Sequence, residues 1–190
     1  MVTVPSCRRC NGEKSKDDDY LRDMLVTDIS TSFDPTARAI KDGKLRRAVG
    51  SRRSHFVREF LPQARPDTLR SKGGIIVAED VYSAPANGQR IERIFSRILR
   101  GLFYHKFKLA LPPKIVFEVR RVQPPELAVF FRDILGSPTM NGPHGIGDIF
   151  KCWEMHATED QRISYWVLLF YGGYVVTVAT ELPESITAAA

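Results

Sequence analysis

The segment 88–108 carries the most regular apolar pattern in the chain, and it constrains the fold more than any other feature. Its apolar residues recur three and four positions apart, which places them on one face of a helix. They are Ile91, Ile94, Phe95, Ile98, Leu99, Leu102 and Phe103. A helix with one apolar face must cover that face with another element. We therefore expect a long amphipathic helix over 88–108 that packs on a sheet.

Strand patterns follow this helix. Apolar and β-branched residues dominate four runs, which we expect to be strands over 115–119, 149–156, 163–171 and 174–180. Gly172-Gly173 lies between the last two runs and predicts a two-residue hairpin turn. A short helix is expected over 124–135, opened by its prolines. The segment 136–147 is rich in Gly and Pro and is expected to be a loop.

Helix signals dominate the first third of the chain. Three helices are expected, over 15–28, 34–48 and 51–61. Ser15 is the expected N-cap of the first helix, and Asp34-Pro35 is an N-cap and first-turn pair for the second. A loop over 63–74 and a short strand over 75–78 follow. The fold class is therefore α+β, with N-terminal helices and a mainly antiparallel sheet packed on the long amphipathic helix.

Basic residues are concentrated in the middle of the chain. The segment 38–121 holds 20 basic and 7 acidic residues, a charge of +13, whereas 1–37 carries −2 and 122–190 carries −5. A basic segment between acidic ends is typical of a surface that faces phosphates. The residues expected to contact nucleic acid are Arg90, Arg93, Arg97 and Arg100 on the long helix, with Arg46, Arg47, Arg52 and Arg53 before it. The alternative is a plain interaction domain whose arginines pair with its own acidic ends.

Composition excludes several classes of protein. Hydrophobic residues make up 43% of the chain and charged residues 26%, which are ordinary values for a globular protein. The longest apolar run, 165–171, is far shorter than the roughly 20 residues that span a bilayer, so we expect no membrane contact. The start of the sequence shows no secretory signal, and we expect a cytoplasmic protein.

Two cysteines near the start form a candidate half of a zinc site. Cys7 and Cys10 are separated by two residues, the spacing at which two thiolates on a tight turn share one zinc ion. A closed structural site needs four ligands, so free thiols are the alternative. Cys152 and His156 fall on one face of an expected strand, where Cys152 is expected to be a core thiol. As an alternative, both could supply the missing ligands.

The sequence around this pair resembles a known family. Cys10-Asn11-Gly12-Glu13-Lys14 and the following segment 15–22 are similar to the closing part of the cysteine-bearing HNH endonuclease motif of bacterial proteins. The segments 100–105 and 170–172 are similar to the downstream region of that group. The resemblance implies that Cys7 and Cys10 match the second zinc knuckle and that Asn11 matches the His/Asn position that opens the motif's helix. It assigns the general-base histidine of the catalytic hairpin to no residue of this chain.

This resemblance sets the expected organisation and function. It implies an HNH-type hydrolase lineage that cleaves phosphodiester bonds of nucleic acid, chiefly DNA, with a divalent ion such as Mg²⁺. We expect a truncated, inactive chain, and the alternative is a non-enzymatic nucleic-acid-binding or interaction module. The expected parts are a remnant of the zinc knuckle with its helix over 1–30, a helical basic linker over 31–72, an α+β domain over 73–183 and a disordered tail over 184–190.

Overall fold

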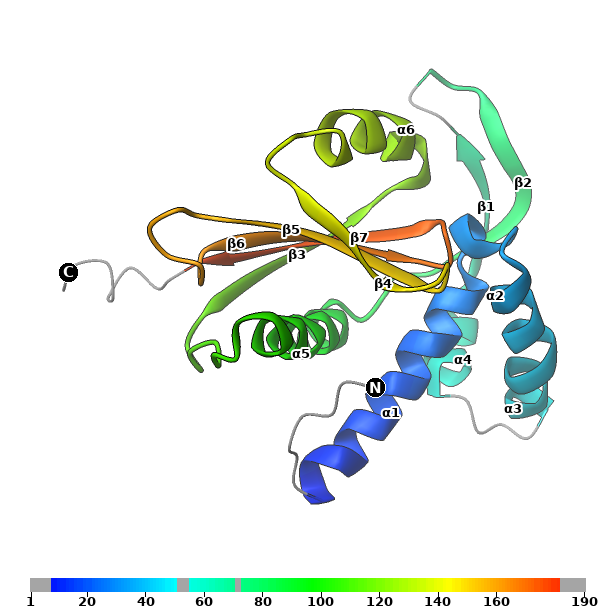
Figure 1. Cartoon of the computed structure of the whole chain (residues 1–190). Coiled ribbons are helices and arrows are strands. Elements are labelled where there is room, and N and C mark those ends of the chain that lie inside the picture. Colours follow the sequence, from blue (N-terminus) through cyan, green and yellow to red (C-terminus); the bar gives the residue numbers. More distant parts are fainter. Residues whose placement is uncertain (1–7, 51–54, 71–72, 182–190) are drawn as a thin grey trace.

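A five-stranded antiparallel sheet forms the centre of the protein. The computed structural model describes residues 8–50, 55–70 and 73–181. The sheet has the order β3-β7-β6-β5-β4. Its strands are β3 (Val116–Val122), β4 (Asn141–Ile146), β5 (Phe150–His156), β6 (Ser164–Phe170) and β7 (Tyr174–Glu181). The long helix α5 (Gly88–Phe107) lies against one face and the short helix α6 (Leu127–Phe130) against the other (Figure 1). The predicted α+β class is confirmed.

Helix α5 forms where the apolar pattern predicts it. The Asn87 side chain caps its start by accepting a hydrogen bond from the backbone N–H of Arg90, and Lys108 ends it in the left-handed conformation. Its buried apolar side chains are Ile94, Phe95, Leu99 and Phe103. Burying each of them contributes roughly 1.5–3 kcal/mol to folding. This burial fixes the helix on the sheet.

Both faces of the sheet are covered, which explains its apolar central strands. Trp166, Leu168 and Phe170 of β6 pack in the core on the side of α5. Val167 of β6 and Val175 of β7 pack in a second core on the side of α6. Alternate residues of one strand therefore serve two cores. A continuous apolar run is the expected sequence of such a strand.

Helices of the first third complete the larger core. They are α1 (Arg8–Thr27), α2 (Pro35–Ile40), α3 (Arg46–Gly50) and α4 (His55–Phe60), with 3₁₀ turns η1 (Ile29–Thr31) and η3 (Leu61–Gln63) and a π-helical turn η2 (Lys41–Leu45) between α2 and α3. Tyr20 and Met24 of α1 are buried in the same core as the α5 side of the sheet. The segments 1–30 and 73–183 therefore share one core, across the boundary expected from the sequence.

The capping signals of the first two helices have different outcomes. The Asp34 side chain accepts a hydrogen bond from the backbone N–H of Ala37, with Pro35 in the first turn, as predicted. The second expected helix, over 34–48, is interrupted by the π-helical turn η2, which contains Gly43. The predicted N-cap at Ser15 is wrong, because α1 begins at Arg8 and Ser15 lies exposed within it. The third expected helix begins at residue 51, and 51–54 lie outside the described residues.

Two segments that the sequence predicts to be loops contain strands. β1 (Arg65–Arg70) lies within 63–74 and pairs with β2 (Ile76–Ser83) in a separate two-stranded sheet. β4 lies within 136–147 and forms an edge of the main sheet. Edge strands tolerate Pro and Gly because one side of their backbone has no partner strand to bond. A Cβ on Gly145 would collide with the backbone oxygen of Phe150, so this close approach requires glycine.

The hairpin between β6 and β7 is one residue longer than predicted. Phe170 pairs with Tyr174, which leaves a three-residue connection from Tyr171 to Gly173. Tyr171 and Gly172 both have positive φ angles, of 48° and 65°. The two glycines therefore mark the turn correctly, but the tyrosine before them also belongs to it.

Candidate functional site

Three of the four arginines of α5 that are predicted to contact nucleic acid converge on one buried carboxylate. Asp17 of α1 accepts hydrogen bonds from Arg90 Nε at 3.0 Å, from Arg93 Nε at 3.0 Å and from Arg97 Nη1 at 2.7 Å. Burial raises the pKa of Asp17, but hydrogen bonds from Arg93 and Arg90 outweigh it and hold the pKa below its usual value. These bonds attach α1 to α5. They occupy guanidinium groups that the sequence predicts to contact nucleic acid.

Further contacts bind two of these arginines into the fold. Arg90 also donates to Glu59 Oε1 at 2.7 Å and to the Lys16 carbonyl at 2.9 Å. Arg100 donates to the carbonyls of Leu111 and Pro112, at 2.8 and 3.0 Å, and so closes the connection between α5 and β3. The side chain of Arg93 is 49% exposed, that of Arg97 35% and that of Arg90 only 11%. The stripe is therefore largely an internal contact of the protein.

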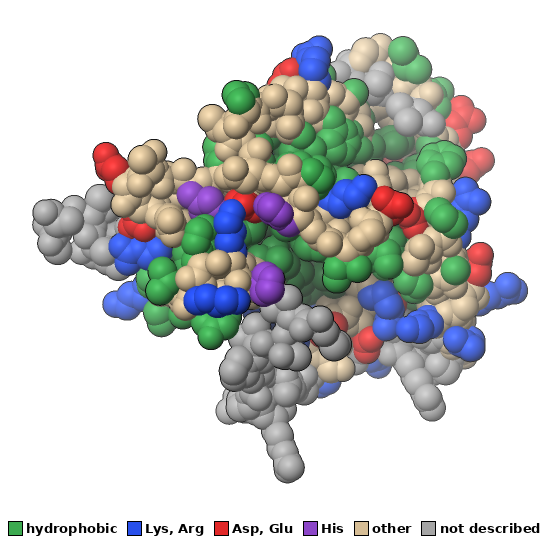
Figure 2. All heavy atoms as spheres, in the orientation of Figure 1, with side chains coloured by type: hydrophobic (Ala, Val, Ile, Leu, Met, Phe, Trp, Pro, Cys, Tyr) green, Lys and Arg blue, Asp and Glu red, His purple; other side chains and the backbone are tan. Residues whose placement is uncertain are grey.

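A second group of cations is exposed on the helical segment 35–50, which we call the basic helix. Its cations are Arg38, Lys41, Lys44, Arg46 and Arg47, and its single acidic residue is Asp42. All five cations are exposed, and none pairs with a carboxylate in the part of the chain that the structure describes. Arg38 donates to the Ser32 carbonyl at 2.7 Å. Figure 2 shows Lys and Arg side chains gathered at the lower right, over α2 and α3.

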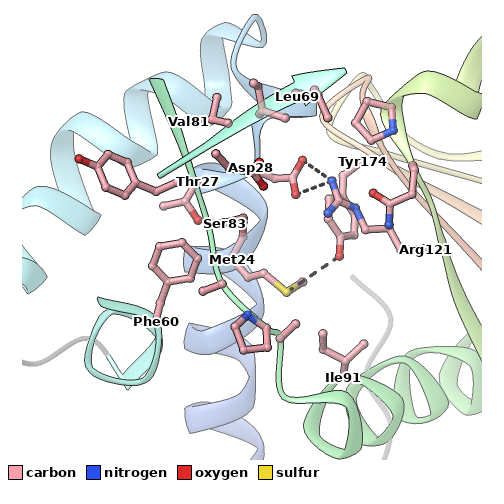
Figure 3. Close-up of a pocket in the computed structure, with 18 of the residues that line it drawn as sticks. Met24, Thr27, Asp28, Phe60, Leu69, Val81, Ser83, Ile91, Arg121 and Tyr174 are labelled. Atoms are coloured by element: carbon pink, nitrogen blue, oxygen red, sulfur yellow. Dashed lines mark hydrogen bonds and ion pairs between the residues drawn. The ribbon is translucent and has the colours of Figure 1, made fainter. Parts of the chain in front are cut away.

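A cleft of about 1150 Å³ opens beside the basic helix. α1, α4 and the β1–β2 hairpin surround it, and the ends of β3 and β7 close it (Figure 3). Its apolar lining includes Met24, Phe60, Leu69, Val81, Ile91 and Val176. Lys41 of the basic helix also lines the cleft. The exposed cations and the cleft therefore form one continuous surface.

The polar end of the cleft holds an unsatisfied donor. Arg121 of β3 donates through Nη2 to Asp28 at 2.7 Å, and its guanidinium stacks on the Tyr174 ring with 4.8 Å to the centroid (Figure 3). Burial raises the pKa of Tyr174, so the phenol stays protonated and donates to the Met24 sulfur at 3.9 Å. Arg121 Nε is buried and has no hydrogen-bond partner among the described residues. A buried donor without an acceptor carries a free-energy cost.

A different polar cluster lies between the sheet and the end of α5. Glu154 of β5 is fully buried and pairs with Lys106, and His144 Nε2 lies 3.4 Å from Glu154 Oε1. Glu154 Oε2 and His156 Nε2 are buried and have no hydrogen-bond partner in the described ranges. Figure 2 shows histidine side chains close to basic and acidic groups over this end of the sheet. Sequence reasoning missed Glu154, although a charged residue between Cys152 and His156 on one strand face is the signal that marks it.

The predicted zinc and HNH residues fall at the edge of what the structure describes. Cys7 lies outside the described residues, and so do the side chains of Cys10 and Asn11. The helix begins at Arg8, before Asn11, whereas the motif opens its helix at that position. Cys152 is buried as expected of a core thiol. Within the described ranges, no three His, Cys, Asp or Glu side chains are placed to hold a metal ion.

Comparison with known proteins adds no relative. No protein-family model, curated protein or solved structure gives a significant match to this chain. Among the described helices, none combines the length and the apolar character that crossing a bilayer requires. The basic helix and the cleft are therefore the features of the described structure from which we argue a function.

Proposed function

We propose that this chain binds the phosphate backbone of nucleic acid through its basic helix, within a protein of HNH-endonuclease lineage. The observation that carries the proposal is the set of five exposed cations that pair with no carboxylate in the described part of the chain. Cations held by internal carboxylates lose much of their attraction for phosphate, whereas unpaired ones release counterions when they bind DNA. The basic helix has this property, and the arginines of α5 largely lack it.

The dimensions of the basic helix suit a nucleic-acid backbone. A regular helix over 35–50 would be about 24 Å long, which corresponds to about seven steps of a DNA strand at 3.4 Å each. Contacts of this kind supply affinity and orientation but do not read sequence. We propose binding and not cleavage, because the resemblance assigns the histidine base to no residue of this chain.

A salt titration tests the proposal. The variant Lys44→Gln/Arg46→Gln/Arg47→Gln removes three exposed charges and keeps residues with good helix propensity. Each lost phosphate contact should flatten the slope of log affinity against log salt by about 0.9. We therefore expect the slope for a fluorescent DNA duplex to fall by roughly two to three units in the triple variant.

The control removes the same charge elsewhere. Lys108→Asn/Lys114→Gln/Arg132→Gln changes three exposed cations that lie outside the basic helix. Its slope should match that of the wild-type protein. An equal loss in both triple variants, or no duplex binding by the wild-type protein at low salt, would contradict the proposal.

A further inference from the structure

We infer that the cleft beside the basic helix is a binding site for an unstacked base of single-stranded nucleic acid. This inference rests on the proposed function, and it adds the kind of strand that the protein prefers. Four features of the cleft support it: its size, an exposed aromatic ring, a partly exposed guanidinium at its polar end, and a cation at its rim.

The cleft is large enough to hold a ligand. Ligand pockets usually measure about 300–1000 Å³, and this cleft measures about 1150 Å³. The β1–β2 hairpin forms one wall and the ends of β3 and β7 form another (Figure 3). The space between them accommodates a nucleotide with part of its neighbour.

Four aromatic side chains line the cleft, and one of them is largely exposed. Tyr82 of β2 lines the cleft and is 67% exposed. Two other tyrosines of the lining are already covered, because Arg90 lies over the Tyr20 ring at 4.2 Å and Arg121 over the Tyr174 ring at 4.8 Å. Bases stack on exposed aromatic side chains whatever their sequence, since every base has a π-face. Tyr82 is therefore the residue expected to hold the base.

The polar end of the cleft matches the edge of a base. Arg121 is held in place by Asp28 and Tyr174, and its buried Nε has no acceptor among the described residues. The Arg121 side chain is 32% exposed, so its guanidinium can donate to a base carbonyl or ring nitrogen. The hydroxyl of Ser83 also lines the cleft and has no hydrogen-bond partner among the described residues, so it can donate or accept. The apolar walls favour the flat faces of the base, and these groups favour its edge.

Cations at the rim of the cleft favour the phosphate backbone of the nucleic acid on either side of the bound base. Lys41 is the member of the basic helix that lines the cleft, and Arg70 of β1 lines it on the hairpin. A nucleic-acid strand that binds along the basic helix reaches Lys41 at the rim of the cleft. There one base can turn into the cleft while its phosphate stays outside. A base inside a duplex is stacked and paired, and moving it out costs a few kcal/mol. The cleft therefore favours single strands, whereas the basic helix alone binds single strands and duplexes alike.

The experiment compares two probes of equal length, a 12-nucleotide oligodeoxythymidine and a 12-base-pair duplex. Tyr82→Ala should weaken binding of the single strand by about tenfold, as expected for the loss of one stacked base, and change duplex binding less than twofold. Tyr82→Phe keeps the ring and should restore single-strand affinity. Tyr104→Ala removes a tyrosine that is exposed on α5, outside the cleft, and should change neither affinity.

The possible results separate the two proposals. If Tyr82→Ala leaves single-strand binding unchanged or weakens duplex binding equally, the inference about the cleft is wrong while the proposed function stands. The same holds if thymidine monophosphate alone binds as tightly as the oligonucleotide, because the site would then be one for free nucleotides. Absence of binding to both probes by the wild-type protein would overturn the proposed function itself.

Discussion

Replacing Asp17 by Asn should destabilise the fold, because three arginines share its carboxylate. The substitution keeps the size of the side chain and removes its charge. Removing one member of a buried ion pair typically costs about 3–5 kcal/mol. Arg93 and Arg97 are partly exposed and can turn toward solvent, whereas Arg90 is nearly buried and keeps Glu59 and the Lys16 carbonyl. We therefore expect a loss of about 2–3 kcal/mol, below the fully buried case.

Urea unfolding measures this loss. Trp166 is buried in the core on the side of α5 and should report the transition by its fluorescence. With a slope of about 2–3 kcal/mol per molar urea, the midpoint should fall by about 1 M. Asp19→Asn is the control, because Asp19 pairs with Arg22 at the surface and its side chain is 56% exposed. Its effect should stay below about 1 kcal/mol.

The same carboxylate predicts a dependence of stability on pH. The pKa of Asp17 is lower in the folded protein than its ordinary value of 3.8. A group with a depressed pKa stabilises the fold above the unfolded pKa, and this contribution is lost as pH falls through the folded pKa. Below pH 4 the wild-type protein should therefore lose stability more steeply than Asp17→Asn. Equal midpoints for the two proteins at pH 7, or parallel declines in acid, would refute the assigned role of this carboxylate.

Two further predictions concern the cluster at the end of α5. Burial raises the pKa of the Cys152 thiol to about 11, so iodoacetamide at pH 8 should leave Cys152 unmodified in the native protein. In guanidinium the same reagent should modify it, and mass spectrometry of the Cys152 peptide measures both results. Rapid labelling of the native protein would contradict the burial of Cys152. Lys106→Met should cost about 3 kcal/mol by leaving Glu154 buried without its ammonium partner. Lys106→Met/Glu154→Leu should recover most of that loss in urea unfolding, and a double variant as unstable as the single one would refute the explanation.

The parts of the fold that sequence reasoning finds are those with local signals. The apolar periodicity of 88–108 locates α5 to within a residue, and Asp34 caps α2 as its sequence context indicates. The sequence analysis does not predict β1 and β4, because their strand structure depends on pairing with a neighbouring strand and not on their composition. β1 contains Pro66, and all six residues of β4 are exposed. A short polar strand at a sheet edge resembles a loop until its partner strand is known.

The sequence predicts phosphate contacts chiefly on α5, whereas our proposal places them on the basic helix, of which the sequence names only Arg46 and Arg47. The arginines of α5 rank above those of 35–50 in the sequence because their spacing on a long helix is regular. Asp17 is more than 70 residues away in the chain, and its local pattern suggests only a helix start. The cleft is harder still to foresee, because its lining comes from α1, α4, β2 and β3. No local sequence pattern predicts that these elements lie next to one another in the fold.

The cations of 38–121 thus include two groups with different surroundings. Net charge counts the cations of a segment, but carboxylates from other segments decide which of them stay available for a partner. Asp17 and Glu59 engage the arginines at the start of α5, and Asp28 engages Arg121. Around 35–50 no described carboxylate plays that part, so the field of those cations extends into solvent beside the cleft. Arginines paired with Asp17 and Asp28 therefore hold the N-terminal helical segment against α5 and the sheet. Under our proposal, the exposed arginines and lysines of 35–50 attract a phosphate backbone to the cleft.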